Sequence, residues 1–152
     1  MNDHQPHQPD RATRLRAAGL KPTASRVAIL EILEEDRRHP TAEMVLDTLA
    51  GRMPSLSLST VYANLEAFLQ AGMIRRIRGA REKLRVDGTV QDHDHAICRV
   101  CGEVFDVPQS LMPRPVGSPF ESEEFDFVDL HIEYEVICSS CRERGDGIVS
   151  RK

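Results

Sequence analysis

The chain has 152 residues, of which 40% are hydrophobic and 29% are charged, and its formal net charge is −4. This length suits one domain of ordinary size or two small ones, and the hydrophobic content is sufficient for packed cores. No run of about 18 apolar residues occurs, and residues 1–9 lack the apolar stretch of a secretory signal. These features exclude membrane-spanning and secreted proteins, so we expect a soluble, cytoplasmic protein.

The net charge conceals a difference between the two halves of the chain. Residues 1–86 carry 14 Lys and Arg against 10 Asp and Glu, whereas residues 87–152 carry 6 against 14. A mildly basic half can approach phosphates, while an acidic half offers the carboxylates that cations bind. All four cysteines lie in the acidic half, where a reducing cytosol would keep them free to bind metal.

The first half reads as a series of capped helices that follow a polar tail, residues 1–9, which we expect to be disordered. Gly19 and Gly72 are suited to end the first and the last of these helices, because glycine adopts the left-handed conformation without steric cost. Each helix is predicted from a polar residue that precedes an apolar run of helical spacing, and the four caps are Asp10, Thr23, Thr41 and Ser59.

A two-stranded hairpin is predicted beyond the fourth helix, from residues 73–78 and 83–86 with a turn at Gly79-Ala80. Four helices and a hairpin form a winged-helix pattern over residues 10–86. A solvated strand edge is the plain alternative for so basic a hairpin, but its place after a recognition helix favours a wing that contacts DNA. Its six basic residues are Arg75, Arg76, Arg78, Arg81, Lys83 and Arg85.

The second half, residues 87–152, reads as a small domain built mainly of strands. Apolar and mostly polar residues alternate over residues 127–138, which predicts a strand with one buried face. A shorter strand is predicted over residues 103–107. The segment 108–124 is rich in Pro, Gly, Ser and acids, and we interpret it as a connector with room for a short helix.

Two Cys-x-x-Cys pairs form the strongest motif. Each pair places two sulfurs on one side of a tight turn, and two pairs complete the tetrahedron that Zn2+ prefers. Because 36 residues separate the pairs, the fold must bring them together, and we expect adjacent strand ends to do so. A dithiol redox pair and buried free cysteines are the alternatives to a structural zinc site at Cys98, Cys101, Cys138 and Cys141.

A second group combines imidazoles with carboxylates around the first cysteine pair. In an extended segment His93 and His95 project to one face, while the aspartates between them project to the other. Nitrogen and oxygen ligands suit Fe2+, Mn2+ or Zn2+. Solvated histidines are the alternative, but the carboxylates on both sides favour a metal site made by Asp87, His93, His95 and Asp106.

Several segments together resemble one known family in their order and spacing. They cover nearly the whole chain, and the ferric uptake regulator family is the one that they resemble. The segments are Gly19-Leu-Lys-Pro-Thr-Ala-Ser-Arg26, His39-Pro-Thr-Ala42, Ser59-Thr-Val-Tyr62 with Asn64 and Leu65, and Asp92-His-Asp-His-Ala-Ile-Cys-Arg-Val-Cys-Gly102.

The resemblance implies an α+β protein, a dimeric repressor with an N-terminal winged helix-turn-helix and a small C-terminal α/β dimerisation domain. It adds His39, which the residues alone would leave as an exposed histidine before a helix cap. A metal held by both halves would select the geometry in which a dimer fits an inverted-repeat operator in double-stranded DNA. The resulting regulatory set looks like that of the peroxide-responsive branch, with Fe2+ or Mn2+ bound by His39, Asp87, His93, His95 and Asp106.

The predicted recognition helix, residues 59–70, would enter the major groove with its N-terminal residues foremost. Ala63 stands where the family usually has Arg or another polar residue, and Ser25 stands where a Gln is common. His131 lies one place off the family's histidine and is interpreted as a surface residue of its strand. The expected DNA-binding residues are Arg26, Ser59, Thr60, Tyr62, Asn64, Arg75, Arg76 and Arg78.

Three other functions stay open at this point. A metal-uptake repressor responding to Mn2+ or Fe2+ without peroxide sensing would use the same ligands. A mononuclear iron enzyme also uses histidine and carboxylate, but five protein ligands leave little room for a substrate, so we expect no enzyme. An interaction module with a zinc ribbon would have no salt-dependent affinity for duplex DNA.

Overall fold

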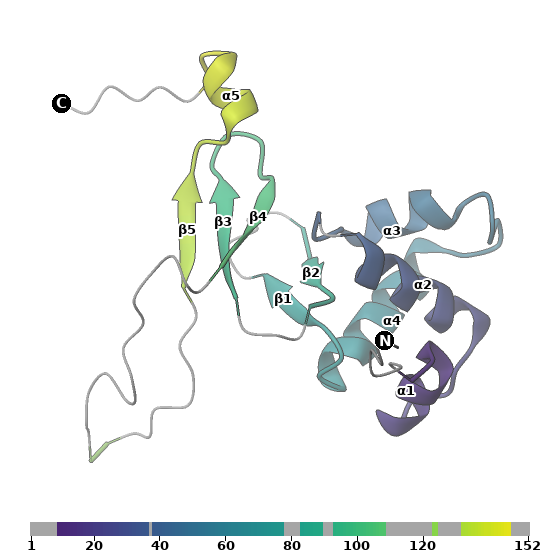
Figure 1. The fold of residues 1–152 in the computed structure, drawn as a ribbon. Coiled ribbons are helices and arrows are strands. Elements are labelled where there is room, and N and C mark those ends of the chain that lie inside the picture. Colours follow the sequence, from purple (N-terminus) through teal and green to yellow (C-terminus); the bar gives the residue numbers. More distant parts are fainter. Residues whose placement is uncertain are drawn as a thin grey trace, which may run out of the picture. The chain divides into compact units, whose positions relative to one another are not determined.

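The computed structural model describes residues 9–36, 38–77, 83–89, 93–108, 123–124 and 132–146. Contacts between Cα atoms divide the chain into two compact units, which meet in sequence near residue 90. The described residues of the first unit are four helices and a hairpin, and those of the second are a small sheet and a short helix (Figure 1). This is the predicted α+β class.

The first three helices are α1 (Arg11–Ala17), α2 (Ala24–Glu35) and α3 (Ala42–Leu49). All three predicted caps are confirmed, since each cap side chain accepts a hydrogen bond from a backbone N–H in the first turn. Gly19 follows α1 with a φ of +75°, and the N–H of Leu20 returns to the carbonyl of Leu15 at 2.8 Å. This is the Schellman ending that the glycine predicted.

The fourth helix, α4 (Leu58–Gln70), begins one residue earlier than predicted, and the predicted cap Ser59 is wrong. Ser57 is the cap, and its hydroxyl accepts from the backbone N–H of Thr60 at 3.2 Å. Starting the helix at Leu58 also lets that side chain pack against the core. Gly72 ends the helix with a φ of +66°, as predicted.

The hairpin consists of β1 (Arg75–Ile77) and β2 (Arg85–Asp87), paired antiparallel with Arg76 opposite Val86. β1 begins two residues later than predicted, after Met73 and Ile74, which lie in the apolar core. β2 covers 85–87, whereas 83–86 was predicted. The predicted turn lies outside the described residues. The core of this unit is a single cluster from all four helices and the hairpin, and its largest fully buried members are Leu15, Ile29, Leu30, Leu49, Leu65 and Phe68.

The second unit is a three-stranded sheet in the order β4-β3-β5, made of β3 (Asp94–Cys98), β4 (Val104–Val107) and β5 (Glu133–Val136) (Figure 1). β3 is antiparallel to β4 and parallel to β5. The predicted strand over 103–107 is confirmed. The strand predicted over 127–138 is confirmed for 133–136, and its residues 127–131, including His131, lie outside the described residues.

The sheet is followed by a short helix that sequence reasoning did not predict, α5 (Ser139–Glu143). Most of the segment 108–124, where a short helix was expected, lies outside the described residues. Among those that are described, no helix is long and apolar enough to cross a membrane.

The cap of α4 yields a matched test. Ser57→Ala removes the acceptor for the Thr60 N–H, and we expect the free energy of unfolding to fall by about 1 kcal/mol. Ser59→Ala changes the same residue type two positions later and should stay within about 0.5 kcal/mol of the parent. Denaturant unfolding of the full chain measures both changes. A larger loss of unfolding free energy for Ser59→Ala than for Ser57→Ala would show that Ser59 is the cap.

Candidate metal centres and nucleic-acid interface

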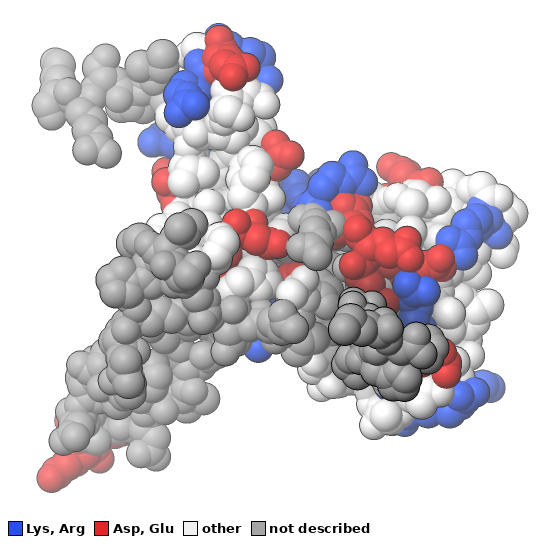
Figure 2. Space-filling view, in the orientation of Figure 1, with Lys and Arg blue, Asp and Glu red and all other residues white. Residues whose placement is uncertain are grey.

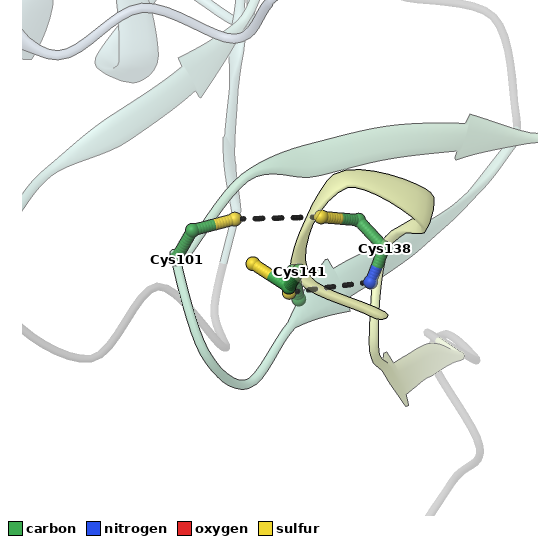
Figure 3. A group of neighbouring side chains, drawn as sticks. Cys101, Cys138 and Cys141 are labelled. Carbon is green, nitrogen blue, oxygen red and sulfur yellow. Dashed lines mark hydrogen bonds between the residues drawn. The ribbon is translucent and has the colours of Figure 1, made fainter. Parts of the chain in front are cut away.

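The two Cys-x-x-Cys pairs meet where β3 and β5 end side by side. In the parallel register Cys98 lies opposite Val136, so the chain leaving β5 reaches Cys138 next to the turn that carries Cys101. Cys141 follows in the first turn of α5. Figure 3 shows the side chains of Cys101, Cys138 and Cys141 turned toward one another. The expectation that adjacent strand ends join the pairs is confirmed.

The spacing of the sulfurs fits a tetrahedral ion. The four Sγ atoms all lie within 4.8 Å of one another, and those of Cys101 and Cys138 are 3.7 Å apart. Four bonds of about 2.3 Å to Zn2+ give a tetrahedron with edges of about 3.8 Å. All four cysteines are free thiols. The donors and their geometry suit structural zinc, and a closed set of four thiolates leaves no position for a substrate.

The thiols also have opposed electrostatic environments. Burial by itself raises the pKa of Cys98, but the backbone N–H groups of Cys101, Cys138 and Val100 together hold that pKa at about 6. One of them, the N–H of Cys138, lies 3.4 Å from the Cys98 sulfur. Burial and the neighbouring thiols raise the pKa of Cys141 to about 12. Four thiolates therefore coexist here only when a cation balances their charge.

Arg144 adds a contact that sequence reasoning missed. Its Nη2 donates to the Sγ of Cys141 at 3.0 Å, and its Nε donates to the carboxylate of Asp146 at 2.9 Å. A basic residue three positions after a helical cysteine is the only signal in the sequence, because i and i+3 are neighbours on a helix. A donor to a ligand atom orients that ligand and tempers its charge.

Zinc is expected to hold the second unit together. Cys138→Ser removes one thiolate and should leave the purified chain with far less zinc than the one ion per chain expected of a closed site, and with a lower unfolding temperature. Ser140→Ala, in the same helix and outside the cluster, is the control and should leave both unchanged. Metal analysis and calorimetry measure the outcome, and full zinc content in Cys138→Ser would contradict the assignment.

Three of the predicted regulatory ligands lie together in the second unit. The Nε2 of His93 is 3.2 Å from the Oδ1 of Asp106, and the Nε2 of His95 is 4.0 Å from the same oxygen. The two imidazoles are in edge contact, with centroids 4.6 Å apart, so they share one face as predicted. The pairing of β3 with β4 places His95 opposite Asp106. Asp94 is on the opposite face, which is buried.

The other two predicted ligands lie together in the first unit. The Nε2 of His39 is 3.9 Å from the Oδ1 of Asp87, at the end of β2. The same oxygen accepts the backbone N–H of Thr89 at 2.7 Å, which orients the carboxylate. Each unit thus holds a preformed imidazole–carboxylate group, the donor chemistry that Fe2+ and Mn2+ accept. The role of these five residues as ligands of one ion stays a prediction.

Gly88, next to Asp87, allows β2 to run close to α2. A Cβ at Gly88 would lie 2.2 Å from the carbonyl oxygen of Leu33, which no rearrangement of side chains can relieve. Gly88→Ala should therefore destabilise the first unit by about 1–3 kcal/mol through overpacking. Gly51→Ala meets no atom within 4 Å and is the control, expected to be neutral or slightly stabilising. Equal stability of the two variants in denaturant would show that β2 does not need this close approach.

The predicted DNA-binding residues fall into different positions. Ser59 and Thr60 are exposed in the first turn of α4, and Arg76 is exposed on β1. Tyr62 is half-buried, and its hydroxyl donates to Glu43 at 3.4 Å. Figure 2 shows basic and acidic side chains interspersed on the visible face of the helical unit. Among the described residues no continuous basic patch is seen on that face, and Arg78 lies outside them.

Asn64 does not have the position expected of a DNA contact. It is buried on α4, its amide donates to the Thr60 carbonyl at 2.8 Å, and its oxygen accepts from the Nε of Arg26 at 3.1 Å. Arg26 also donates to the Lys21 carbonyl at 3.0 Å. Asn64 thus joins α4 to Arg26, and its contact with DNA stays a prediction.

Comparison with known proteins identifies the family of this chain. The family model described as the ferric uptake regulator family matches residues 17–135. The chain belongs to the ferric uptake regulator family. The resemblance stated from the sequence is confirmed, and the matched residues include all the predicted metal ligands except Cys138 and Cys141.

Members of the family with assigned roles include regulators of the peroxide response. The chain is 38% identical over 130 residues to the peroxide operon regulator of Bacillus subtilis, covering 86% of this chain and 90% of that protein. It is 29% identical over 132 residues to the peroxide-responsive repressor PerR of Staphylococcus epidermidis, covering 87% and 88%.

Solved structures of family members share the fold. The ferric uptake regulator of Francisella tularensis with iron is 28% identical, with a TM-score of 0.66, and the alignment covers 82% of this chain and 96% of that one. The ferric uptake regulator of Pseudomonas aeruginosa with manganese is also 28% identical, with a TM-score of 0.61, covering 84% and 96%.

Proposed function

We propose that this member of the ferric uptake regulator family is a metal-dependent transcriptional repressor that binds operator DNA as a homodimer and is inactivated by peroxide. The observation that supports this most directly is the preformed group of His93, His95 and Asp106, in a chain whose similar proteins include named peroxide regulators. We further propose residues 10–86 as the DNA-binding domain and 87–152 as the metal-binding dimerisation domain of a cytoplasmic protein.

The regulatory ion is proposed to take its ligands from both units. His93, His95 and Asp106 supply three donors, while His39 and Asp87 supply two more. An ion that needs both groups binds best to the conformation in which they converge, so its binding shifts the population toward that conformation. The free energy of this shift equals the difference between the ion's binding free energies for the two conformations. Zn2+ at the four cysteines is the permanent structural ion.

DNA recognition is assigned to the start of α4 and to the wing. Exposed Ser59 and Thr60, with Tyr62, would reach base edges, since this is how recognition helices enter the major groove. Arg75, Arg76 and Arg78 would contact phosphates and make binding depend on salt. A twofold dimer reads an inverted repeat, so selection from a library of random duplexes should recover one.

Peroxide sensing is proposed to work through damage to a histidine. His39, Asp87, His93, His95 and Asp106 would hold Fe2+, which would supply the redox chemistry that activates hydrogen peroxide, whereas Mn2+ would not. The net change adds one peroxide oxygen atom to a ring carbon of His39 or His93, and the other oxygen leaves as water. The altered imidazole binds metal poorly, so the converged conformation loses its stabilising ion and the operator is released.

The decisive experiment compares the chain loaded with Fe2+ and with Mn2+. Low hydrogen peroxide should add the mass of one oxygen atom to the Fe2+ form only, at a peptide that contains His39 or His93, and should abolish operator binding in step. The Mn2+ form is the matched control, because it has the same ligands and should keep its DNA. Intact-mass and peptide analysis locate the change.

The alternative is a metal-uptake repressor that responds to Mn2+ or Fe2+ alone. It predicts that operator binding follows metal concentration and survives peroxide with no mass added to either histidine. The names of the similar proteins favour peroxide sensing. They also describe regulators, which supports our expectation that this chain is not an enzyme.

A further inference from the structure

Arg85 stands in the hairpin that the sequence assigned to DNA contact, but its side chain contacts its own unit. Its Nη1 lies 3.2 Å from the carbonyl oxygen of Arg38 and 3.1 Å from that of His39. A terminal guanidinium nitrogen has two hydrogens, so it can donate to both carbonyls at once. A cation used in this way is less available to a phosphate.

The two carbonyls flank an unusual piece of backbone. His39 has a φ of +56°, and within the described residues it is the only non-glycine residue with a positive φ. That conformation is unfavourable for residues with a Cβ. His39 also precedes Pro40, which disfavours all but extended conformations of the residue before it. A backbone of this kind persists only where its surroundings hold it, and such positions cluster at functional sites.

β2 makes the contacts that keep the backbone around His39 in place. Thr41 forms a β-bridge with Arg85, and the N–H of Val86 lies 3.4 Å from the carbonyl oxygen of Pro40. Asp87, two residues beyond Arg85, is on the same face of the strand, and its carboxylate lies 3.9 Å from the His39 imidazole. One short strand therefore carries both the donor that holds the His39 backbone and the carboxylate beside its ring.

We propose that Arg85 is a positioning residue for the regulatory metal site. Its guanidinium holds His39 in the left-handed conformation, so that the imidazole faces Asp87. The inference rests on the proposed function, because it takes His39 and Asp87 as ligands. This role of Arg85 also makes metal affinity depend on the hairpin, because Arg85 belongs to the wing and positions the metal ligand His39.

The test compares Arg85→Met with Arg76→Met in the full, zinc-loaded chain. Methionine keeps a long apolar stem and removes the donors. Arg76 is exposed on the paired strand, opposite Val86, and lies 3.9 Å from Glu66. Arg76→Met is therefore the control, because it removes the same charge from the same hairpin. Titration with Mn2+ should give about tenfold weaker binding for Arg85→Met, as for other groups that orient ligands, and unchanged binding for Arg76→Met.

Operator binding at saturating Mn2+ separates positioning from phosphate contact. If Arg85 positions His39, excess metal restores the operator affinity of Arg85→Met to within about twofold of the parent, with the same salt dependence. If Arg85 contacts a phosphate, affinity stays low at saturating metal and the salt slope falls by about one. That second outcome overturns the proposal.

Two further measurements keep the result clear. An unchanged unfolding temperature of Arg85→Met shows that weaker Mn2+ binding is not a loss of fold, and Arg85→Lys, which keeps the charge and a donor, should recover part of the affinity. His39→Ala tests the premise: if it binds Mn2+ like the parent, the proposed regulatory site is wrong. If His39→Ala loses Mn2+ but Arg85→Met does not, the regulatory site stands and the role of Arg85 is overturned.

Discussion

The parallel pairing of β3 with β5 is the constraint on which the second unit depends. It joins strands that are distant in sequence, with Cys98 opposite Val136, and so places the two cysteine pairs at one end of the sheet. The antiparallel partner β4 meanwhile sets Asp106 opposite His95. One central strand thus ends in the thiolate cluster and begins beside the imidazole–carboxylate group. Zinc bound by the four cysteines would stabilise the end of the same strand at whose start His93 and His95 lie.

In the first unit, β2 has a comparable role with different chemistry. The strand is three residues long, yet it pairs with β1, holds the carbonyls of Arg38 and His39, and presents Asp87. Its close approach to α2 requires Gly88, because a Cβ there would overlap the Leu33 carbonyl. The imidazole–carboxylate pair of the first unit is therefore built on hydrogen-bonded backbone.

The distribution of charge in the chain limits which basic residues are available to DNA phosphates. The acidic residues are concentrated in the second half, where metal ligands lie, and the basic residues of the first half are partly engaged within the protein. Arg26 holds Asn64, and Arg85 holds backbone carbonyls. Counting basic residues in the hairpin thus overstates the charge available to phosphate, and the exposed Arg76 is a better candidate than Arg85.

The amino-acid sequence by itself determined the local elements and the donor chemistry. Capping residues and glycines act within a few residues of their own position, so three caps and the left-handed endings of α1 and α4 followed from pattern alone, and two Cys-x-x-Cys pairs specify a thiolate site wherever they meet. Ser57 and Ser59 are chemically alike, and only the packing of Leu58 and the reach to the Thr60 N–H decided between them. The tertiary structure alone decided which long-range pairs form: the register that joins the cysteine pairs, the burial of Asn64, and the hydrogen bond from Arg85 to the carbonyl of His39. These depend on contacts between residues 38 to 47 positions apart, where sequence spacing contains no distance information.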